Sequence, residues 1–167
     1  MKTDRILAVG EGGSGLLGDP DWPWTVLYGI GWLFVIVGLV DIALLWYPFR
    51  FGVPEYEFAS TGSMLDALPL FTIGLAFLLA GAGARGNASV ARLVVVIAGI
   101  MAVIVVAAVG LYALTVPLAL KSVSAPDLKL GLEKSMAKVT VQAIAYPVTY
   151  IAIVLKGRRL LARTRSK

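Results

Sequence analysis

Apolar residues along this chain gather in four long blocks, which short polar stretches separate. A helix needs about 20 apolar residues to cross the roughly 30 Å hydrocarbon core of a bilayer, and the blocks are close to this length, the second being a little short. The pattern predicts an all-α fold, a four-helix transmembrane bundle. The blocks are Trp24–Tyr47, Ala67–Ala84, Leu93–Leu120 and Val139–Leu155, so residues 1–23 would form a flexible leader, 24–155 the transmembrane domain and 156–167 a basic tail.

Basic residues favour one side of this predicted bundle. Four crossings in sequence place Lys2, Arg5, Arg85, Arg92 and the tail 156–167 on the same side, and the tail alone holds six of the fifteen Lys and Arg residues. By the positive-inside rule that side is cytoplasmic, so both termini are expected in the cytoplasm. Four lysines between the third and fourth blocks favour the opposite orientation, but they are outnumbered.

Prolines set the expected helix limits. The second helix should begin near Pro69, where the first turn tolerates a missing N–H, and the third should tilt or end near Pro117. Pro147 predicts a kink in the fourth. Ser124 and Asp127 have the spacing of a capping box, and apolar residues then recur every four positions. This predicts a short amphipathic helix on the outer membrane surface before the fourth span.

Composition narrows the chemistry further. The chain is 59% hydrophobic and 15% charged, and it contains neither cysteine nor histidine. Disulfides, thiol nucleophiles, Cys/His zinc sites, histidine-ligated haem and the Ser-His-Asp triad are therefore excluded. We expect no catalytic residues, no metal and no cofactor, and we expect the protein not to be an enzyme.

Asp41 is the residue that most needs explanation, because it lies inside the first apolar block, about 9 Å along the helix from Tyr47 at a rise of 1.5 Å per residue. It should face protein and form an intramembrane polar pair with Gln142 or Lys138 of the fourth helix, although a proton-carrying role is the alternative. Small residues that allow helices to approach closely are expected at Gly31, Gly38, Gly74, Gly81, Gly99 and Gly110.

The connection after the first block is acidic and aromatic. It contains Glu55, Tyr56, Glu57 and Phe58, and Asp66 follows shortly after. Oxygen ligands of this kind suit a hard cation, but the spacing is not that of a calcium loop. The favoured interpretation is that Ser63 and Asp66 form a capping box for the second helix and that Glu55 and Glu57 are solvated. A third possibility is that Tyr56 and Phe58 anchor a neighbouring protein.

Three other features have simpler explanations than a specific site. The segment 10–15 matches G-x-G-x-x-G, but no βαβ unit can follow it, so it is expected to be flexible leader. Asn87 begins a glycosylation sequon on the predicted cytoplasmic side, where it would not be modified. The tail is expected to signal topology and to touch anionic lipid head groups rather than nucleic acid. Its head-group candidates are Arg158, Arg159, Arg163 and Arg165.

The run FGVPEYEF at 51–58, followed by LDALPL at 65–70, resembles the outer loop of small uncharacterised bacterial integral membrane proteins. The resemblance implies a multi-pass protein of the bacterial inner (plasma) membrane and carries no activity with it. We therefore expect a non-catalytic accessory, structural or interaction subunit, which contacts membrane lipids and either a membrane-protein partner or further copies of itself. The alternative is a small proton-coupled transporter using Asp41, which is similar in scale to small multidrug exporters.

Overall fold

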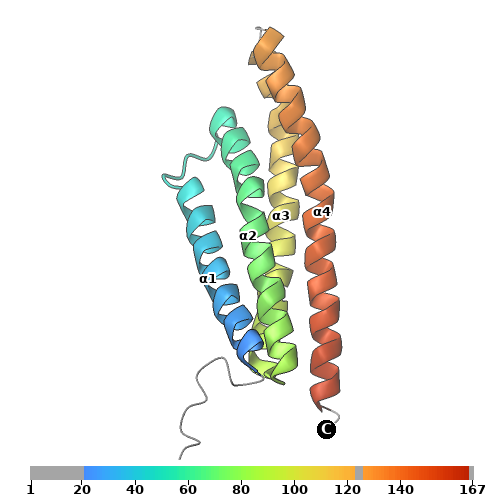
Figure 1. Cartoon of the computed structure of the whole chain (residues 1–167). Helices are drawn as coiled ribbons and strands as arrows, with labels where there is room; N and C mark the ends of the chain where they lie inside the picture. The colour runs from blue at the N-terminus through green and yellow to red at the C-terminus, as the bar shows by residue number, and fades with distance from the viewer. Residues whose placement is uncertain (1–20, 123–125, 166–167) are drawn as a thin grey trace, which may run out of the picture.

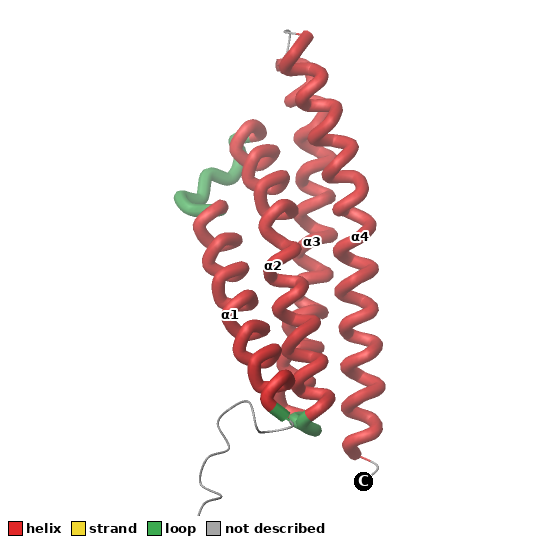
Figure 2. Tube along the Cα trace, in the orientation of Figure 1, coloured by secondary structure: helices red, strands yellow, loops and turns green. Residues whose placement is uncertain are grey.

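The computed structural model describes residues 21–122 and 126–165, and within these ranges it consists of four helices (Figures 1 and 2). Residues 1–20, which contain the glycine motif of the expected leader, lie outside the described residues, and the last two leader residues, Trp22 and Pro23, belong to the first helix. All four helices are long and apolar enough to span a membrane, which confirms the predicted number of spans. The helices are α1 (Trp22–Leu45), α2 (Pro54–Ala84), α3 (Ala88–Ser122) and α4 (Pro126–Arg165).

Helix α2 is the centre of the bundle. It contacts α1, α3 and α4, and α3 also contacts α4, whereas α1 contacts only α2 among the described residues. The start of α1 and the end of α4 lie at the same end of the molecule, as four crossings require, while α3 and α4 extend beyond the other two helices at the opposite end (Figure 1). Most of the buried side chains belong to α2 and α3, including Leu68, Phe71, Leu75, Val94 and Val105.

Glycines allow α1 and α2 to approach with little more than backbone between them. A Cβ added at Gly31 would lie 3.1 Å from the carbonyl oxygen of Gly74, and one added at Gly38 would lie 2.8 Å from Cβ of Phe71. Gly81 faces the ring of Tyr28. The first two helices therefore use their glycines for close packing, as predicted from the sequence.

Two glycines of α3 behave differently. An added Cβ at Gly99 or at Gly110 would meet nothing within 4 Å among the described residues. Among the described residues, neither glycine lets another helix of this chain approach closely, so the role expected from the sequence is not seen.

The second helix starts earlier than the position of Pro69 predicts. It begins at Pro54, where the missing N–H has no helical partner to lose, and it continues through Pro69. The expected start near Pro69 is wrong, and so is the capping box of Ser63 and Asp66, because both residues lie within α2. Helix α3 likewise continues through Pro117. Prolines are tolerated inside membrane helices because neighbouring groups compensate the freed carbonyl.

Helix α3 begins with a side-chain cap. Asn87 precedes its first residue, and the side-chain oxygen of Asn87 accepts a hydrogen bond of 3.2 Å from the Val90 backbone N–H. The residue that opens the sequon therefore has a structural role as an N-cap.

The fourth helix is one continuous element from Pro126 to Arg165. The separate surface helix expected before the fourth span is therefore wrong. Its residues form the first turns of α4, since between Gly131 and Pro147 no proline or glycine interrupts the helix, and Figure 2 shows α4 as one unbroken helix. Ser124, its expected cap, lies outside the described residues.

Candidate functional site

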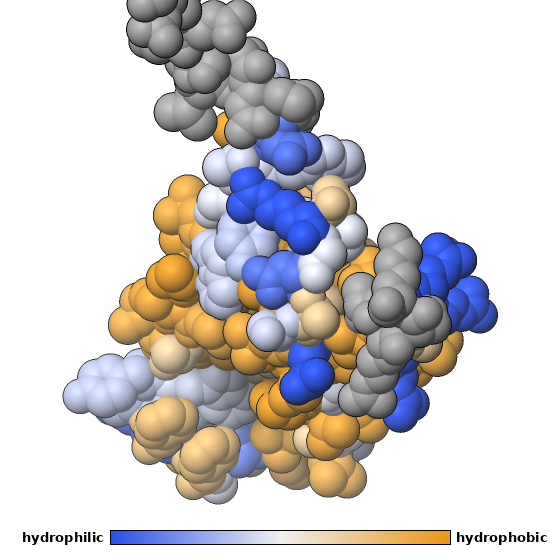
Figure 3. Space-filling model, turned by 90° about the horizontal axis from the view of Figure 1, so that it is seen from below, coloured by the Kyte–Doolittle hydropathy of each residue, from blue (hydrophilic) through white to orange (hydrophobic). Residues whose placement is uncertain are grey.

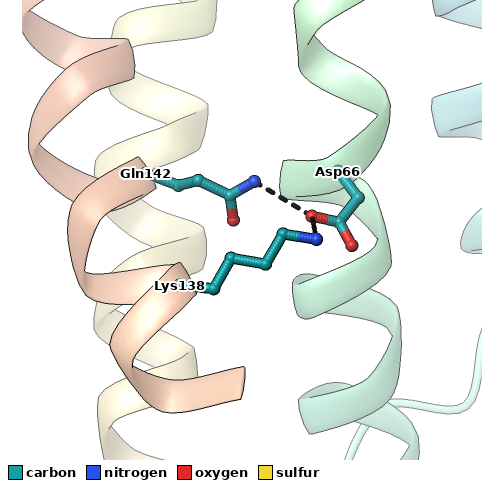
Figure 4. Close-up of polar contacts among 3 residues, drawn as sticks. All are labelled: Asp66, Lys138 and Gln142. Carbon is teal, nitrogen blue, oxygen red and sulfur yellow. Dashed lines mark hydrogen bonds and ion pairs between the residues drawn. The ribbon is translucent and has the colours of Figure 1, made fainter. Parts of the chain in front are cut away.

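A polar cluster joins α2 to α4. Asp66 Oδ1 accepts a hydrogen bond of 2.9 Å from Gln142 Nε2 and lies 2.7 Å from Lys138 Nζ (Figure 4). Lys138 and Gln142 are four residues apart on α4, so both reach the same carboxylate from one face of the helix. The side chains of Lys138 and Asp66 are 58% and 49% exposed, which makes this a half-exposed ion pair at the edge of the α2–α4 contact.

The cluster corrects the pairing expected from the sequence. Lys138 and Gln142 do act together on one carboxylate, but the carboxylate is Asp66 and not Asp41. Helix α1 has no contact with α4 among the described residues, so Asp41 cannot meet either partner. Asp41 is itself exposed on α1, and no hydrogen bond or ion pair joins it to another described residue.

The two carboxylates lie at different depths. Trp46 Nε1 donates to Met64 Sδ over 3.3 Å, which places Met64 beside the aromatic end of α1. Asp66 follows Met64 by two residues on α2, so it lies about 3 Å from this level toward the middle of the span. Asp41 precedes Trp46 by five residues on α1, so it lies about 7.5 Å from the same level in the same direction. The ion pair therefore lies near the interfacial aromatic residues, and Asp41 lies deeper within the span.

Both carboxylates open to the same side of the α1–α2 pair. Phe34 of α1 stacks on Phe77 of α2 with ring centroids 6.3 Å apart. Asp41 follows Phe34 by seven residues, so the two share one face of α1. Asp66 precedes Phe77 by eleven residues, so these two share one face of α2. Because the two phenylalanine rings stack on each other, both aspartates lie on the side of the helix pair where the rings meet.

Most of the predicted outer-loop residues lie in α2 instead and serve contacts within the chain. The Tyr56 hydroxyl donates to the Trp46 carbonyl over 2.6 Å, and the Gly52 N–H donates to Glu57 Oε1 over 2.8 Å. Phe58 stacks on Tyr112 of α3 at 4.7 Å between centroids. Tyr56 and Phe58 are therefore not projecting anchors, and among the described side chains Glu57 bonds to Gly52 and forms no acidic cluster with Asp66. The side chain of Glu55 lies outside the described residues.

Exposed aromatic side chains occur in the connection between α1 and α2. Tyr47, Phe49 and Phe51 are the most exposed, and Phe51 stacks between Phe49 and Trp46 at 5.9 and 5.7 Å. Amphipathic and aromatic rings of this kind are typical of the membrane–water interface. The signal was present in the sequence as the density of aromatic residues after the first apolar block.

The opposite end of the bundle carries basic side chains. Arg158, Arg159 and Arg163 lie in the last turns of α4, while the side chain of Arg165 lies outside the described residues. Figure 3 views the molecule from this end and shows hydrophilic residues gathered in small groups against a largely hydrophobic surface. Another cation, Arg85, donates to the hydroxyl of Thr25 and lies over the ring of Tyr28, which ties the end of α2 to the start of α1.

The arrangement offers charge pairing and hydrogen bonding. Among the residues that the structure describes, no three carboxylates come together as a metal site would require. Tyr150 and Thr72 share a hydrogen bond of 3.0 Å between α4 and α2, which adds a second polar link of the same kind. Comparison of the chain with protein-family models, with curated proteins and with solved structures finds no match.

Proposed function

We propose that this protein is a non-catalytic accessory subunit that binds a membrane-spanning helix of another protein along the exposed face of α1. The observation that supports the proposal is Asp41, an exposed carboxylate within a membrane span that has no partner among the described residues. A carboxylate at the bilayer centre costs about 2.5 to 3.5 kcal/mol, and less toward the interface. A donor on a neighbouring helix would offset this cost.

The surface around Asp41 suits a helix. Leu33, Val37, Val40 and Leu44 are exposed and recur at intervals of four and three, so they form one apolar stripe along α1. Asp41 flanks this stripe. The partner helix should therefore be apolar with one Lys or Arg at the depth of Asp41, because a cation both donates hydrogen bonds and balances the charge.

A second copy of this chain fits the same surface less well. In a twofold dimer the same patch of both copies meets itself, so a dimer through α1 brings Asp41 close to its equivalent. Two carboxylates in contact repel and would require a shared proton. Charge complementarity therefore favours a different protein.

We assign the end of the bundle that contains the end of α4 to the cytoplasm, in a bacterial inner membrane. The basic residues at that end support this orientation by the positive-inside rule. The first loop, with its resemblance to small bacterial membrane proteins, supports the choice of membrane.

Site-specific crosslinking tests the proposal. Because the chain contains no cysteine, single cysteines carrying a photoreactive thiol probe can be placed without background. Val40→Cys on the α1 stripe and Val103→Cys on the outer face of α3 are matched probes, at 51% and 70% exposure. In the native membrane, Val40→Cys should crosslink to one protein and Val103→Cys should not.

The captured helix should carry Lys or Arg at the level of Asp41, and Asp41→Leu should reduce the adduct at least tenfold. The proposal fails if both probes capture the same proteins, if the adduct survives Asp41→Leu unchanged, or if Val40→Cys captures only another copy of this chain.

The same carboxylate supports a second candidate, the small proton-coupled transporter. In that case Asp41→Asn should abolish substrate-driven proton movement in liposomes containing a pH-sensitive dye, while the bundle stays folded. We place this candidate second because a large groove lined by residues of α1, α2 and α4 lies at the other end of the helices and does not include Asp41 among its lining residues. Wild-type protein that moves no protons with any cationic substrate would exclude it.

A further inference from the structure

A groove with a volume of about 1070 Å³ opens between the start of α1, the second half of α2 and the last turns of α4. Small residues line its α2 side, including Ala76, Ala80 and Gly83. Small side chains at these positions leave a largely apolar space on the surface of the bundle, next to the lipid that would surround a membrane-spanning helix.

Basic residues line the α4 side of the groove. Lys156, Arg159 and Arg163 are separated by three and four residues, so they share one face of the helix. No Asp or Glu is among the residues that line the groove. Lys156 and Arg159 are exposed, and they carry the argument that follows.

The depth of these cations matches the position of a lipid phosphate. Trp24, near the start of α1, also lines the groove, and tryptophan marks the head-group level of a bilayer. Lys156 lies seven residues before Arg163, about 10 Å deeper at 1.5 Å per residue. Long basic side chains reach from such depths toward the interface while their stems remain in apolar surroundings.

We propose that this groove binds one anionic phospholipid from the surrounding bilayer. An acyl chain lies along the small residues of α2, and Lys156 and Arg159 hold the phosphate. A zwitterionic lipid adds a cation to the head group, which the same two side chains repel. The site is separate from the α1 face and does not depend on a partner there.

Native mass spectrometry of the purified, delipidated full chain tests this site. Phosphatidylglycerol and phosphatidylcholine with identical acyl chains are titrated separately, and the first should bind more tightly as a single molecule per chain. Arg159→Gln should weaken phosphatidylglycerol binding about fivefold, because one cation near a charged lipid surface contributes about 1 kcal/mol. The matched control is Arg158→Gln, an identical change of charge at an exposed neighbour that does not line the groove.

A second variant tests the apolar part of the groove. Ala80 is exposed and lines it, so Ala80→Leu should fill the space and weaken both lipids while the helix content measured by circular dichroism stays unchanged. The proposal is overturned if the two lipids bind equally, if Arg158→Gln weakens binding as much as Arg159→Gln, or if Ala80→Leu has no effect on either lipid.

Discussion

Replacing Gly74 by alanine should loosen α1 from the bundle. An added Cβ at Gly74 would lie 2.9 Å from the Gly31 carbonyl oxygen and 2.9 Å from the Val35 backbone nitrogen. Ordinary contacts begin near 3.4 Å, so the two helices would have to separate by about 0.5 Å. Both atoms belong to backbone and cannot move aside as the end of a side chain can. Overpacking of this kind costs about 1 to 3 kcal/mol.

Gly99→Ala and Gly110→Ala are matched controls, because an added Cβ at either position meets nothing within 4 Å. All three variants gain the helix propensity of alanine over glycine, which is about 1 kcal/mol in water. The difference between Gly74→Ala and the controls therefore isolates the contact between α1 and α2. Unfolding by titration with a denaturing detergent in bicelles should show Gly74→Ala less stable than either control by about 1 to 3 kcal/mol.

A structural readout accompanies the stability measurement. Cysteines introduced in α1 and α2 should form a crosslink in the wild-type background that Gly74→Ala slows, since α1 has no other helix to hold it among the described residues. Equal stability of Gly74→Ala and Gly99→Ala, with unchanged crosslinking, would show that the backbones are not in contact and would refute the reasoning.

Two polar links between α2 and α4 give further expectations. Asp66→Leu and Lys138→Leu should show a coupling energy of no more than about 1 kcal/mol in a double-mutant cycle, because the pair is half exposed; a larger value would mean that lipid shields it. Tyr150→Phe and Thr72→Val should couple by about 0.6 kcal/mol, the average for hydrogen bonds between membrane helices. Additive effects in that cycle would show that the hydroxyls do not bond.

The number of helices could be predicted from the sequence because hydropathy over some twenty residues is a local property. A close-packing role for the glycines of the first two helices could also be predicted, since Gly31 and Gly38, and likewise Gly74 and Gly81, are seven residues apart, but which helices they join could not. Both predictions depend on what one or two segments do in lipid and need no knowledge of the whole bundle.

Helix ends could not be predicted in the same way. The expectation of a helix start near Pro69, and of a helix end near Pro117 as one of two alternatives, follows the rule for water-exposed helices, where an internal proline costs about 3 kcal/mol. Inside a membrane protein, neighbouring groups reduce that cost and the alternative of an irregular backbone in lipid is worse. Helix α4 starts at Pro126 and continues unbroken into the fourth span, whereas the periodicity of its first turns predicts a separate helix.

The identity of the carboxylate that meets Lys138 and Gln142 could not be predicted from the sequence. The shared face of Lys138 and Gln142 on α4 is confirmed, whereas their expected partner Asp41 is wrong and the carboxylate they meet is Asp66. Which carboxylate it is depends on the lateral order of the helices, and spacing along one helix does not contain that order. Asp66 lies on the helix that α4 contacts, whereas Asp41 lies on a helix that it does not.

The same lateral order of the helices explains why Asp41 has no partner among the described residues. In a closed four-helix bundle each helix packs against two neighbours, but here α2 occupies the centre and α1 has one neighbour among the described residues. Asp41 lies on the side of α1 that a second neighbour would cover, beside the exposed stripe of Val37 and Val40. A helix supplying a cation at this position would complete the packing of α1 and balance its charge in one step, which is why a single substitution at Asp41 should separate binding from folding.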